Sequence, residues 1–476
     1  MKVCVIVEGC YPYVLGGVSS WVHNIIKMFP QVEFAICSVI PDRTYRGKFV
    51  YELPENVSEV YEIYLNDKDW APKQRRGSLS DKEYSTLRRL IIGHNVDWDN
   101  VFRFFQEKER SLNDLLMGED FLNIITALYD REYPEIAFTD FLWTMRSVYL
   151  PLFHALGSQV PKADIYHCVS TGYAGVVGCL ARYLYGGKLL LTEHGIYTRE
   201  REEELIKADW VQGIYKNIWI ALFHKMSQLI YDRADRVVSL FGHARELQIE
   251  LGCPPEKTMV IPNGVDASRY ADIPGKRPDD EGFVHIGAIV RITPIKDIKT
   301  MIQAFSVAKR QAPELKLWVM GPDAEDMEYA RECYEYVDYL GLSDIEFTGT
   351  IDTREYMGRM DAVILTSISE GQPLVILEGY AARKPSIATD VGNCRGLIYG
   401  EDGDELGAAG ILTHVMNVDE IAAAMVFIAK EREKARAMGE VGYRRMMSRF
   451  KLSDLKNAYG ALYRQLGEEL GIEWRE

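Results

Sequence analysis

The sequence contains no continuous apolar run of about eighteen residues, the length that a membrane-spanning helix needs. Its first residues turn apolar at once and then reach Glu8-Gly9, without the apolar stretch and small-residue cleavage site of a signal peptide. None of the eight cysteines forms a Cys-x-x-Cys pair, so a disulfide framework and a structural zinc site are both disfavoured. These absences predict a cytoplasmic protein with reduced, mostly buried thiols and no membrane span.

Basic residues are also fewer than acidic ones. The chain has 55 lysines and arginines against 70 acidic residues, a formal net charge of −15. A protein of this charge is repelled by nucleic acid and by anionic membranes unless it carries a local basic patch. We interpret the short run at Lys73, Arg75 and Arg76 as solvated surface, so nucleic acid is not expected as a partner.

Cofactor signatures are missing as well. No Gly-x-Gly-x-x-Gly fingerprint of a dinucleotide site occurs in the first βα turn, and no Asp-x-Asp follows an apolar strand. The acidic stretch Arg199 to Glu204 fits a solvated helix face better than a metal site. The sequence therefore predicts neither a metal nor a cofactor.

The pattern of apolar runs indicates an α/β protein of two doubly wound halves. With 476 residues, the chain is too long for one ordinary core. Strand-like runs alternate with helical stretches in both halves, which favours parallel sheets with helical crossovers. The expected strands are 3–7, 34–40, 165–169, 188–192, 236–240 and 259–262, then 284–290, 315–320, 345–348, 362–366, 386–388 and 410–413.

Composition divides the chain into parts. Residues 1–271 form the first Rossmann-like domain, and aromatic, charged and helical segments at about 67–155 indicate an insertion in it. The Pro-, Gly- and charge-rich stretch 272–282 is the expected linker, and 283–450 form the second Rossmann-like domain. Residues 451–476 carry an amphipathic helix that we expect to pack back on the first domain.

The strongest motif follows the apolar strand that ends at Thr366. Glu370 lies in the loop after it, and Pro373 suits the first turn of a helix, so Glu378 lies one to two turns into that helix. The loop presents free N–H groups at a positive helix end, which favours anionic oxygens. Two carboxylates so placed can bind two parts of one polyhydroxylated ligand, although two surface glutamates would show the same spacing.

A cation pair follows the first strand of the second half. Arg291 and Lys296 flank a turn at the head of a helix, with Asp297 as its N-cap. Together with the helix dipole they could hold a diphosphate. A solvated Arg/Lys pair near a capped helix is the alternative.

Two weaker features lie in the first half. Gly16-Gly17 after the first strand let a backbone approach a ligand closely, although a plain turn is as consistent. His194 follows the strand 188–192 and would lie at its carboxyl end, although lone histidines are more often structural.

As a set, these features resemble the family 4 glycosyltransferases of the GT-B fold. Glu370-x7-Glu378 resembles that family's E-x7-E motif, and Ile261 to Asp266 resembles the segment that ends its N-terminal domain. The resemblance implies a donor diphosphate held by Arg291 and Lys296. Residues 371–374 would hold sugar and phosphate through their backbone. The implied donor-site residues are Gly16, Gly17, Arg291, Lys296, Glu370, Gly371, Gln372, Pro373, Leu374 and Glu378.

The resemblance also implies the catalytic roles. Glu378 would bind the ribose of a uridine nucleotide, Glu370 would contact the donor hexose, and His194 would contact the transferred sugar. Arg291 and Lys296 would neutralise the leaving diphosphate without a metal, with retention of configuration. An epimerase, a phosphorylase or a non-catalytic scaffold of the same fold are the alternatives.

Four stretches resemble more narrowly the family members that make Pel-type exopolysaccharide. They are 8–20, 294–300, 366–370 and 389–395. This likeness implies a UDP-sugar donor, a polysaccharide acceptor and a synthase complex at the inner membrane as partner. Two positions depart from the wider family, since Val290 replaces a common glycine and Arg395-Gly396 stands where many members have a glutamate.

Overall fold

The computed structural model describes residues 1–67, 78–93, 95–107, 111–208, 211 and 213–474. The basic run at Lys73, Arg75 and Arg76 lies outside them. The chain divides into two compact units. The first comprises 1–239, 245–260 and 460–476, and the second comprises 240–244 and 261–459.

A seven-stranded sheet, in which every neighbouring pair is parallel, forms the centre of the first unit. Its order is β3-β2-β1-β4-β5-β6-β7. The strands are β1 (Lys2–Glu8), β2 (Glu33–Ile40), β3 (Val57–Tyr64), β4 (Ile165–Cys168), β5 (Lys188–Glu193), β6 (Arg236–Ser239) and β7 (Thr258–Val260). Because the chain winds outward in opposite directions from β1 and β4, the carboxyl ends of these two strands mark the switch point of the sheet.

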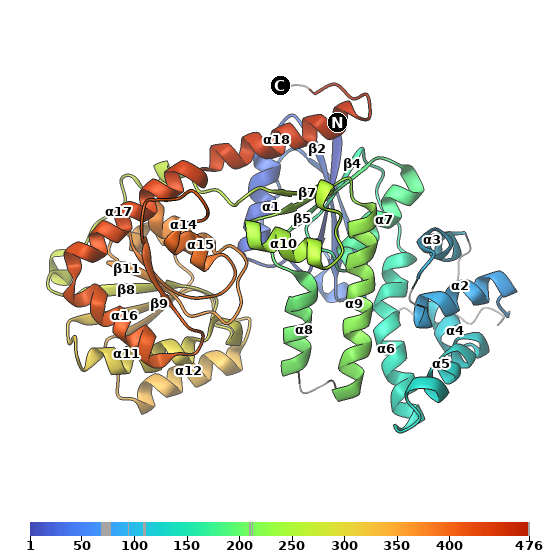
Figure 1. Ribbon diagram of the computed structural model, residues 1–476, viewed down its shortest axis with the longest axis horizontal. Coiled ribbons are helices and arrows are strands. Elements are labelled where there is room, and N and C mark those ends of the chain that lie inside the picture. Colours follow the sequence, from blue (N-terminus) through green and yellow to red (C-terminus); the bar gives the residue numbers. More distant parts are fainter. Residues whose placement is uncertain (68–77, 94, 108–110, 209–210, 212, 475–476) are drawn as a thin grey trace. The chain divides into compact units, whose positions relative to one another are not determined.

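Helices connect these strands, and five of them form the predicted insertion between β3 and β4 (Figure 1). The crossover helices are α1 (Gly17–Met28), α7 (Tyr173–Tyr185), α8 (Tyr197–Lys207), α9 (Gly213–Arg233) and α10 (Gly242–Glu250). The insertion comprises α2 (Asp81–Ile92), α3 (Trp98–Gln106), α4 (Leu112–Met117), α5 (Glu119–Glu132) and α6 (Phe138–Leu156).

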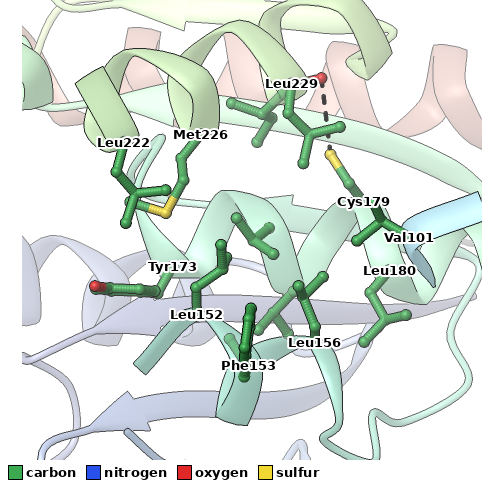
Figure 2. Close-up of a cluster of buried hydrophobic side chains, with 14 of the residues drawn as sticks. Val101, Leu152, Phe153, Leu156, Tyr173, Cys179, Leu180, Leu222, Met226 and Leu229 are labelled. Atoms are coloured by element: carbon green, nitrogen blue, oxygen red, sulfur yellow. Dashed lines mark hydrogen bonds between the residues drawn. The ribbon is translucent and has the colours of Figure 1, made fainter. Parts of the chain in front are cut away.

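The insertion shares its core with the sheet layer. Helix α6 packs against α7 and α9, and Figure 2 shows apolar side chains of the three helices side by side. The labelled residues there include Leu152, Phe153 and Leu156 of α6, Tyr173, Cys179 and Leu180 of α7, and Leu222, Met226 and Leu229 of α9. The Cys179 thiol donates a long hydrogen bond to the Leu229 carbonyl at 4.0 Å. Because these side chains are buried, the insertion is an integral part of the first unit.

The second unit contains a six-stranded parallel sheet of order β10-β9-β8-β11-β12-β13. Its strands are β8 (Val284–Ile289), β9 (Leu315–Met320), β10 (Ile345–Gly349), β11 (Ala362–Leu365), β12 (Ser386–Thr389) and β13 (Gly410–Thr413). Its helices are α11 (Ile298–Lys309), α12 (Met327–Tyr339), α13 (Thr353–Met357), α14 (Leu374–Ala381), α15 (Cys394–Tyr399), α16 (Val418–Lys430) and α17 (Arg432–Arg449). The switch point lies between β8 and β11.

The last helix, α18 (Leu452–Glu468), passes from one unit to the other. Its residues from 460 onward group with the first unit. There the Tyr463 hydroxyl is hydrogen-bonded to His167 Nδ1 at 2.7 Å, and Nε2 of the same ring is 2.8 Å from the Thr192 hydroxyl. A fully buried polar contact thus fixes the end of the chain to β4 and β5.

Three expectations from the sequence need adjustment. Strand β3 was not expected, because Glu59 and Glu62 interrupt its apolar character at the edge of the sheet. The division falls between 260 and 261, not at 271. Residues 272–282 are not a free linker either, since they group with the second unit and Asp280 there is buried in an ion pair with Arg359.

The cysteines are the free and mostly buried thiols that the sequence predicts. All eight are free, and every one except the half-buried Cys10 is buried. Burial raises the pKa of the Cys37 thiol to about 12, so this thiol is neutral and unreactive at neutral pH. Among the described residues, no helix has the length and apolar character needed to cross a bilayer.

Candidate functional site

The second unit brings Lys296 and Glu370 together at its switch point. Lys296 ends a short 3₁₀ turn, Pro294–Lys296, after β8, and Glu370 lies in the loop after β11. The Lys296 ammonium forms an ion pair with the Glu370 carboxylate, whose Oε1 also accepts a hydrogen bond from the Ser367 hydroxyl at 2.6 Å. The two side chains keep 16% and 13% of their surface exposed, so a ligand can still reach them.

Backbone contacts hold the two loops in place. The Thr366 hydroxyl donates to the Lys296 carbonyl at 2.9 Å, and the Ile368 amide donates to the Ile295 carbonyl at 2.8 Å. Since both loops follow neighbouring parallel strands, their polar groups converge outside the carboxyl edge, where ligands of such sheets bind.

Asp297 caps the helix that follows Lys296. Its side chain accepts a hydrogen bond from the Thr300 amide at 3.4 Å, which confirms the predicted N-cap. Its backbone is left-handed, with φ +47°, a conformation that aspartate tolerates better than most residues. The tight turn places Lys296 directly before the positive end of α11.

Arg291 lies apart from this pair. Its guanidinium forms an ion pair with Glu325, in the loop after β9, and both side chains are exposed. From the sequence we expected Arg291 and Lys296 to flank one turn, and the structure places them on either side of it. Of the two cations, it is Lys296 that forms the ion pair with Glu370. A ligand that uses both cations would have to draw Arg291 away from Glu325.

The segment from Gly371 to Leu374 offers backbone groups at the start of α14. Pro373 occupies the N-cap position, and within the described chain neither a side-chain cap nor an acidic residue in the first turn competes for the helix amides. The Asn393 amide donates to the Gly371 carbonyl at 2.8 Å. A Cβ at Gly392, whose φ is +53°, would overlap the Glu370 and Gly371 carbonyls, so this close approach requires glycine.

The side chain of Gln372 is committed to the protein. It is 6% exposed, accepts a hydrogen bond from the Asn263 amide at 2.6 Å and donates to the Leu240 carbonyl at 3.3 Å. Its backbone carbonyl accepts from the Asn263 side chain at 3.3 Å. A ligand role of Gln372 is therefore confined to its backbone.

Glu378 lies in the second turn of α14 and is half-buried. Arg269 and the Tyr270 hydroxyl lie close enough to its carboxyl group to influence its pKa. Burial raises the pKa of Glu378 to about 7, although Arg269 and Tyr270 both act to lower it. Neither Tyr270 nor Arg269 was expected from the sequence, because they belong to a 3₁₀ turn more than a hundred positions before Glu378.

In the first unit, the glycine pair begins a helix. Gly16 occupies the N-cap position of α1, Gly17 is its first residue, and a Cβ on either would meet no atom within 4 Å. The extended backbone of Gly16 is open to any residue. The geometry thus leaves room above this loop, but gives no steric reason for glycine at either position.

His194 directly follows β5 at the carboxyl edge of the first sheet. Its ring makes an edge-to-face contact with Trp21 of α1, with ring centroids 4.6 Å apart. Its Nε2 is buried and has no hydrogen-bond partner among the described residues. Burial lowers the pKa of His194 to about 4, so the imidazole is neutral at physiological pH and can accept or donate a hydrogen bond.

Two carboxylates at this edge, the half-buried Glu8 and the buried Glu193, were not expected from the sequence. Glu8 accepts hydrogen bonds from the Tyr197 hydroxyl at 3.0 Å and the Ala174 amide at 3.2 Å. Glu193 accepts from the Tyr231 hydroxyl at 2.8 Å and from Gln248 at 3.0 Å. Their position as the last residue of a strand was the available signal.

The acidic stretch Arg199 to Glu204 is only partly the solvated face that we expected. Glu200 is half-buried beside Gly195, where any Cβ would overlap its carboxylate. Burial raises the pKa of Glu200 to about 7. The helix turns this residue inward while Glu203 and Glu204 stay exposed, and a pattern of charges alone does not reveal that. Among the described residues, no cluster of three metal-ligating side chains occurs.

Two family models match the chain. The one described as "Glycosyl transferases group 1" matches residues 281–431, which include the Lys296–Glu370 pair and Glu378. This part of the chain therefore resembles the group 1 glycosyltransferases. The model described as "Domain of unknown function (DUF3492)" matches residues 1–256, more than half of the chain, so the chain belongs to that family. The match to residues 281–431 is consistent with the transferase activity that the sequence predicts.

Curated relatives are identical to this chain at about a quarter of the aligned residues. D-inositol 3-phosphate glycosyltransferase of Geodermatophilus obscurus is 26% identical over 314 residues, 62% of this chain and 65% of its own. Alpha-maltose-1-phosphate synthase of Mycolicibacterium smegmatis is 24% identical over 321 residues, 62% of this chain and 78% of its own. The putative glycosyltransferase EpsD of Bacillus subtilis is 25% identical over 62% of this chain and 77% of its own. The match thus spans just under two thirds of the first of these relatives.

Solved structures agree on the fold. Anabaena Alr3699/HepE in complex with UDP-glucose has a TM-score of 0.60 and 16% identity, with 99% of each chain covered. Sucrose-phosphate synthase of Thermosynechococcus elongatus has a TM-score of 0.63 and 16% identity, with 98% of this chain and 99% of its own covered. At this identity the likeness concerns the fold, and it confirms the predicted GT-B architecture of two Rossmann-like domains.

Proposed function

We propose that the protein is a retaining, metal-independent glycosyltransferase that moves a hexose or an N-acetylhexosamine from a UDP-sugar to a growing exopolysaccharide of the Pel type. The observation that carries the donor part is the convergence of Lys296 and Glu370 beside the open start of α14, with Glu378 one turn further along. This arrangement offers a cation and helix amides to phosphate, and carboxylates to hydroxyl groups.

The choice of UDP-sugar draws on the resemblance and on the comparisons. The E-x7-E spacing resembles that of uridine-nucleotide enzymes, and a structural neighbour is described as a complex with UDP-glucose. The Pel-type product rests on the four stretches that resemble PelF, the cytoplasmic transferase of Pel synthesis. A relative named EpsD and another named exopolysaccharide phosphotransferase SCO2592 from Streptomyces coelicolor are consistent with an exopolysaccharide role.

The chemistry follows from where charge develops. As the bond between the anomeric carbon and the diphosphate breaks, negative charge grows on the leaving phosphate and positive charge on the sugar ring. Lys296 and the amides of residues 371–374 would stabilise the phosphate, with Arg291 joining once it leaves Glu325. Glu370 would accept hydrogen bonds from the sugar hydroxyls. Since no residue is assigned as a nucleophile, the acceptor hydroxyl attacks on the same face, and the departing phosphate takes its proton.

His194 would contact the transferred sugar. Its imidazole is neutral because burial keeps its pKa near 4, so it would act through a hydrogen bond and not through charge. The synthase complex at the inner membrane remains the proposed partner, and the cytoplasm the proposed compartment. Polysaccharide is the proposed acceptor.

Calorimetry with UDP, ADP, GDP and a panel of UDP-sugars tests the donor class. We expect UDP to bind and the Lys296→Ala variant to bind it at least tenfold more weakly, about 1.4 kcal/mol. Absence of UDP binding would contradict the assignment of a UDP-sugar as the donor. Product analysis with labelled UDP-sugar then separates the alternatives: transfer to glycan supports the proposal, epimerised nucleotide indicates an epimerase, and intact donor without turnover indicates a scaffold.

A further inference from the structure

The loop after β2 exposes aromatic rings at the carboxyl edge of the first sheet. Tyr45 and Phe49 keep 38% and 37% of their surface exposed, and Val50, which directly follows Phe49, keeps 51%. Tyr45, Phe49 and Val50 thus form a small group of exposed apolar side chains, and groups of this kind can serve as ligand-binding surfaces.

The two rings rest on a buried third ring. Tyr13, from the loop after β1, is 5% exposed and meets Tyr45 at a centroid distance of 6.3 Å and Phe49 at 5.4 Å, both edge-to-face. Aromatic pairs prefer this arrangement, so Tyr13 fixes both exposed rings.

The carboxylate of Glu62 holds the loop after β2 in place through hydrogen bonds. Glu62, in β3, accepts hydrogen bonds from the hydroxyls of Tyr13 and Tyr64 and, at 2.9 Å, from the Gly47 amide. Gly47 has φ +65°, which glycine adopts without strain. The exposed rings are therefore supported by an ordered polar network.

The same contacts place the rings beside the glycine loop. The Val50 amide donates to the Pro12 carbonyl at 2.9 Å, and the Ser38 hydroxyl donates to the Tyr11 carbonyl at 2.9 Å. Both loops follow adjacent parallel strands, so the rings lie at the edge of the sheet that also carries Gly16-Gly17. Leu15, between Tyr13 and the glycines, is itself 49% exposed.

We propose that Tyr45 and Phe49 form a stacking platform for an extended oligosaccharide, the already polymerised part of the acceptor. The C–H faces of pyranose rings are apolar and flat enough to pack on aromatic rings, while their hydroxyls stay in water. This inference rests on the proposed function, because it assigns a site to the acceptor of that reaction.

Charge around the platform favours a sugar over an anionic surface. Arg43 is held by Asp67 through two hydrogen bonds of 2.9 and 2.7 Å and lies over the Tyr64 ring. Arg46 lies close enough to Glu62 to lower the pKa of its carboxyl. Lys48 is exposed on the same loop, but residues 41–67 carry six acidic side chains against three basic ones, so binding to an anionic lipid surface would have little net electrostatic support.

Saturation-transfer NMR on the full chain tests the platform with hexasaccharides of β-1,4-glucose, β-1,4-N-acetylglucosamine, its de-N-acetylated form, and α-1,4-N-acetylgalactosamine. We expect at least one to bind, and the double variant Tyr45→Ala/Phe49→Ala to weaken its binding about tenfold. Phe49→Trp should retain binding, and Phe49→Leu should weaken it by less than the double variant does, because stacking needs a planar ring. Tyr339→Ala, an exposed tyrosine of the second unit, is the matched control.

The outcomes separate the platform from the donor assignment. UDP affinity, measured on the same samples, should not change in any platform variant. If UDP fails to bind while an oligosaccharide binds through Tyr45 and Phe49, the proposed function fails and the platform stands. If UDP binds but no hexasaccharide does, or the double variant binds as well as the wild type, the platform is wrong. Sedimentation with phosphatidylglycerol vesicles that depends on the two rings, without sugar binding, also overturns it.

Discussion

Lys296 and Glu370 form an ion pair although 74 positions separate them and they follow different strands of the second sheet. Their loops meet because β8 and β11 are neighbours at the point where the sheet reverses its strand order. The pair links the group proposed to bind phosphate with the group proposed to bind the sugar. Either side chain therefore positions the other before a donor arrives.

Replacing Lys296 should weaken donor binding. Lys296→Ala removes a cation that would contact the diphosphate, and a hydrogen bond to a charged group contributes about 1.5–3 kcal/mol, roughly ten- to a hundredfold in affinity. Calorimetry with UDP measures this. Lys299→Ala is the matched control, since Lys299 lies one turn later and pairs with the exposed Glu332. Equal losses in both variants would show that overall charge and not the position of Lys296 matters.

Replacing Glu370 should affect turnover more than binding. Glu370→Gln keeps the size of the side chain but removes its charge, which frees the Lys296 ammonium for phosphate. We expect UDP affinity to stay within a few-fold or to rise, while kcat falls about a hundredfold, as for other groups that act mainly in the transition state. Steady-state kinetics with a UDP-sugar separates the two effects. A loss of UDP affinity as large as the loss of kcat would contradict the assignment.

The binding of UDP should depend on the ionisation of Glu378. Because burial raises the pKa of this carboxyl to about 7, the group is mostly protonated at pH 6 and mostly ionised at pH 8. An ionised carboxylate accepts hydrogen bonds from ribose hydroxyls more strongly, so affinity should rise as pH rises through 7. The group has the opposite effect on folding. A raised acid pKa stabilises the fold below about pH 4.5, and this contribution is lost as pH rises through 7.

Calorimetry at pH 6, 7 and 8 tests this, with Glu378→Gln as the control. UDP has a titrating phosphate of its own, and the glutamine variant retains that part of the pH dependence. The difference between the two curves belongs to Glu378. 2′-Deoxyuridine diphosphate should reduce that difference if the carboxylate binds the 2′-hydroxyl, and parallel curves for the variant and the wild type would contradict the role.

Much of this site followed from the sequence because its parts lie directly after apolar strands. Lys296 and Asp297 belong to one strand–turn–helix segment, 284–309, and Glu370 belongs to another, 362–381, so periodicity and turn chemistry locate them. The contacts between these residues could not be predicted from the sequence. The pairing of Lys296 with Glu370 depends on which strands are neighbours, and no local pattern specifies that order.

Distant contacts explain the other differences. Tyr270 lies near Glu378 although it belongs to a distant 3₁₀ turn, and the Gln372 side chain is hydrogen-bonded to Asn263 and Leu240. Strand β3 lies at the edge of its sheet, where its glutamates are tolerated, so it lacks the continuous apolar run of buried strands. In each case, tertiary placement determines what a residue does.

His194 should act as a neutral group. Since its pKa lies near 4, kcat should show no titration of this imidazole between pH 5 and 8, and NMR of the labelled ring should show one neutral form over that range. His194→Ala should lower kcat about tenfold to a hundredfold by removal of one hydrogen bond in the transition state. His167→Gln changes another buried imidazole at the same edge and serves as the control for altered packing. A titration of His194 near pH 6.5 would show that the ring is solvated in solution.

The contact between Tyr463 and His167 should stabilise the end of the chain on the first unit. Both side chains are fully buried, and the hydroxyl lies 2.7 Å from Nδ1, so Tyr463→Phe leaves that ring nitrogen without this partner while the ring still packs on Phe29. Loss of one partner of a buried polar pair costs about 1–3 kcal/mol. Hydrogen exchange of the amides at 460–468 should accelerate by roughly five- to a hundredfold if they exchange through opening of this segment. Tyr339→Phe, at an exposed position, should leave exchange unchanged, and UDP affinity should be the same in both variants. Unaltered exchange in Tyr463→Phe would mean that apolar packing alone holds the helix in place.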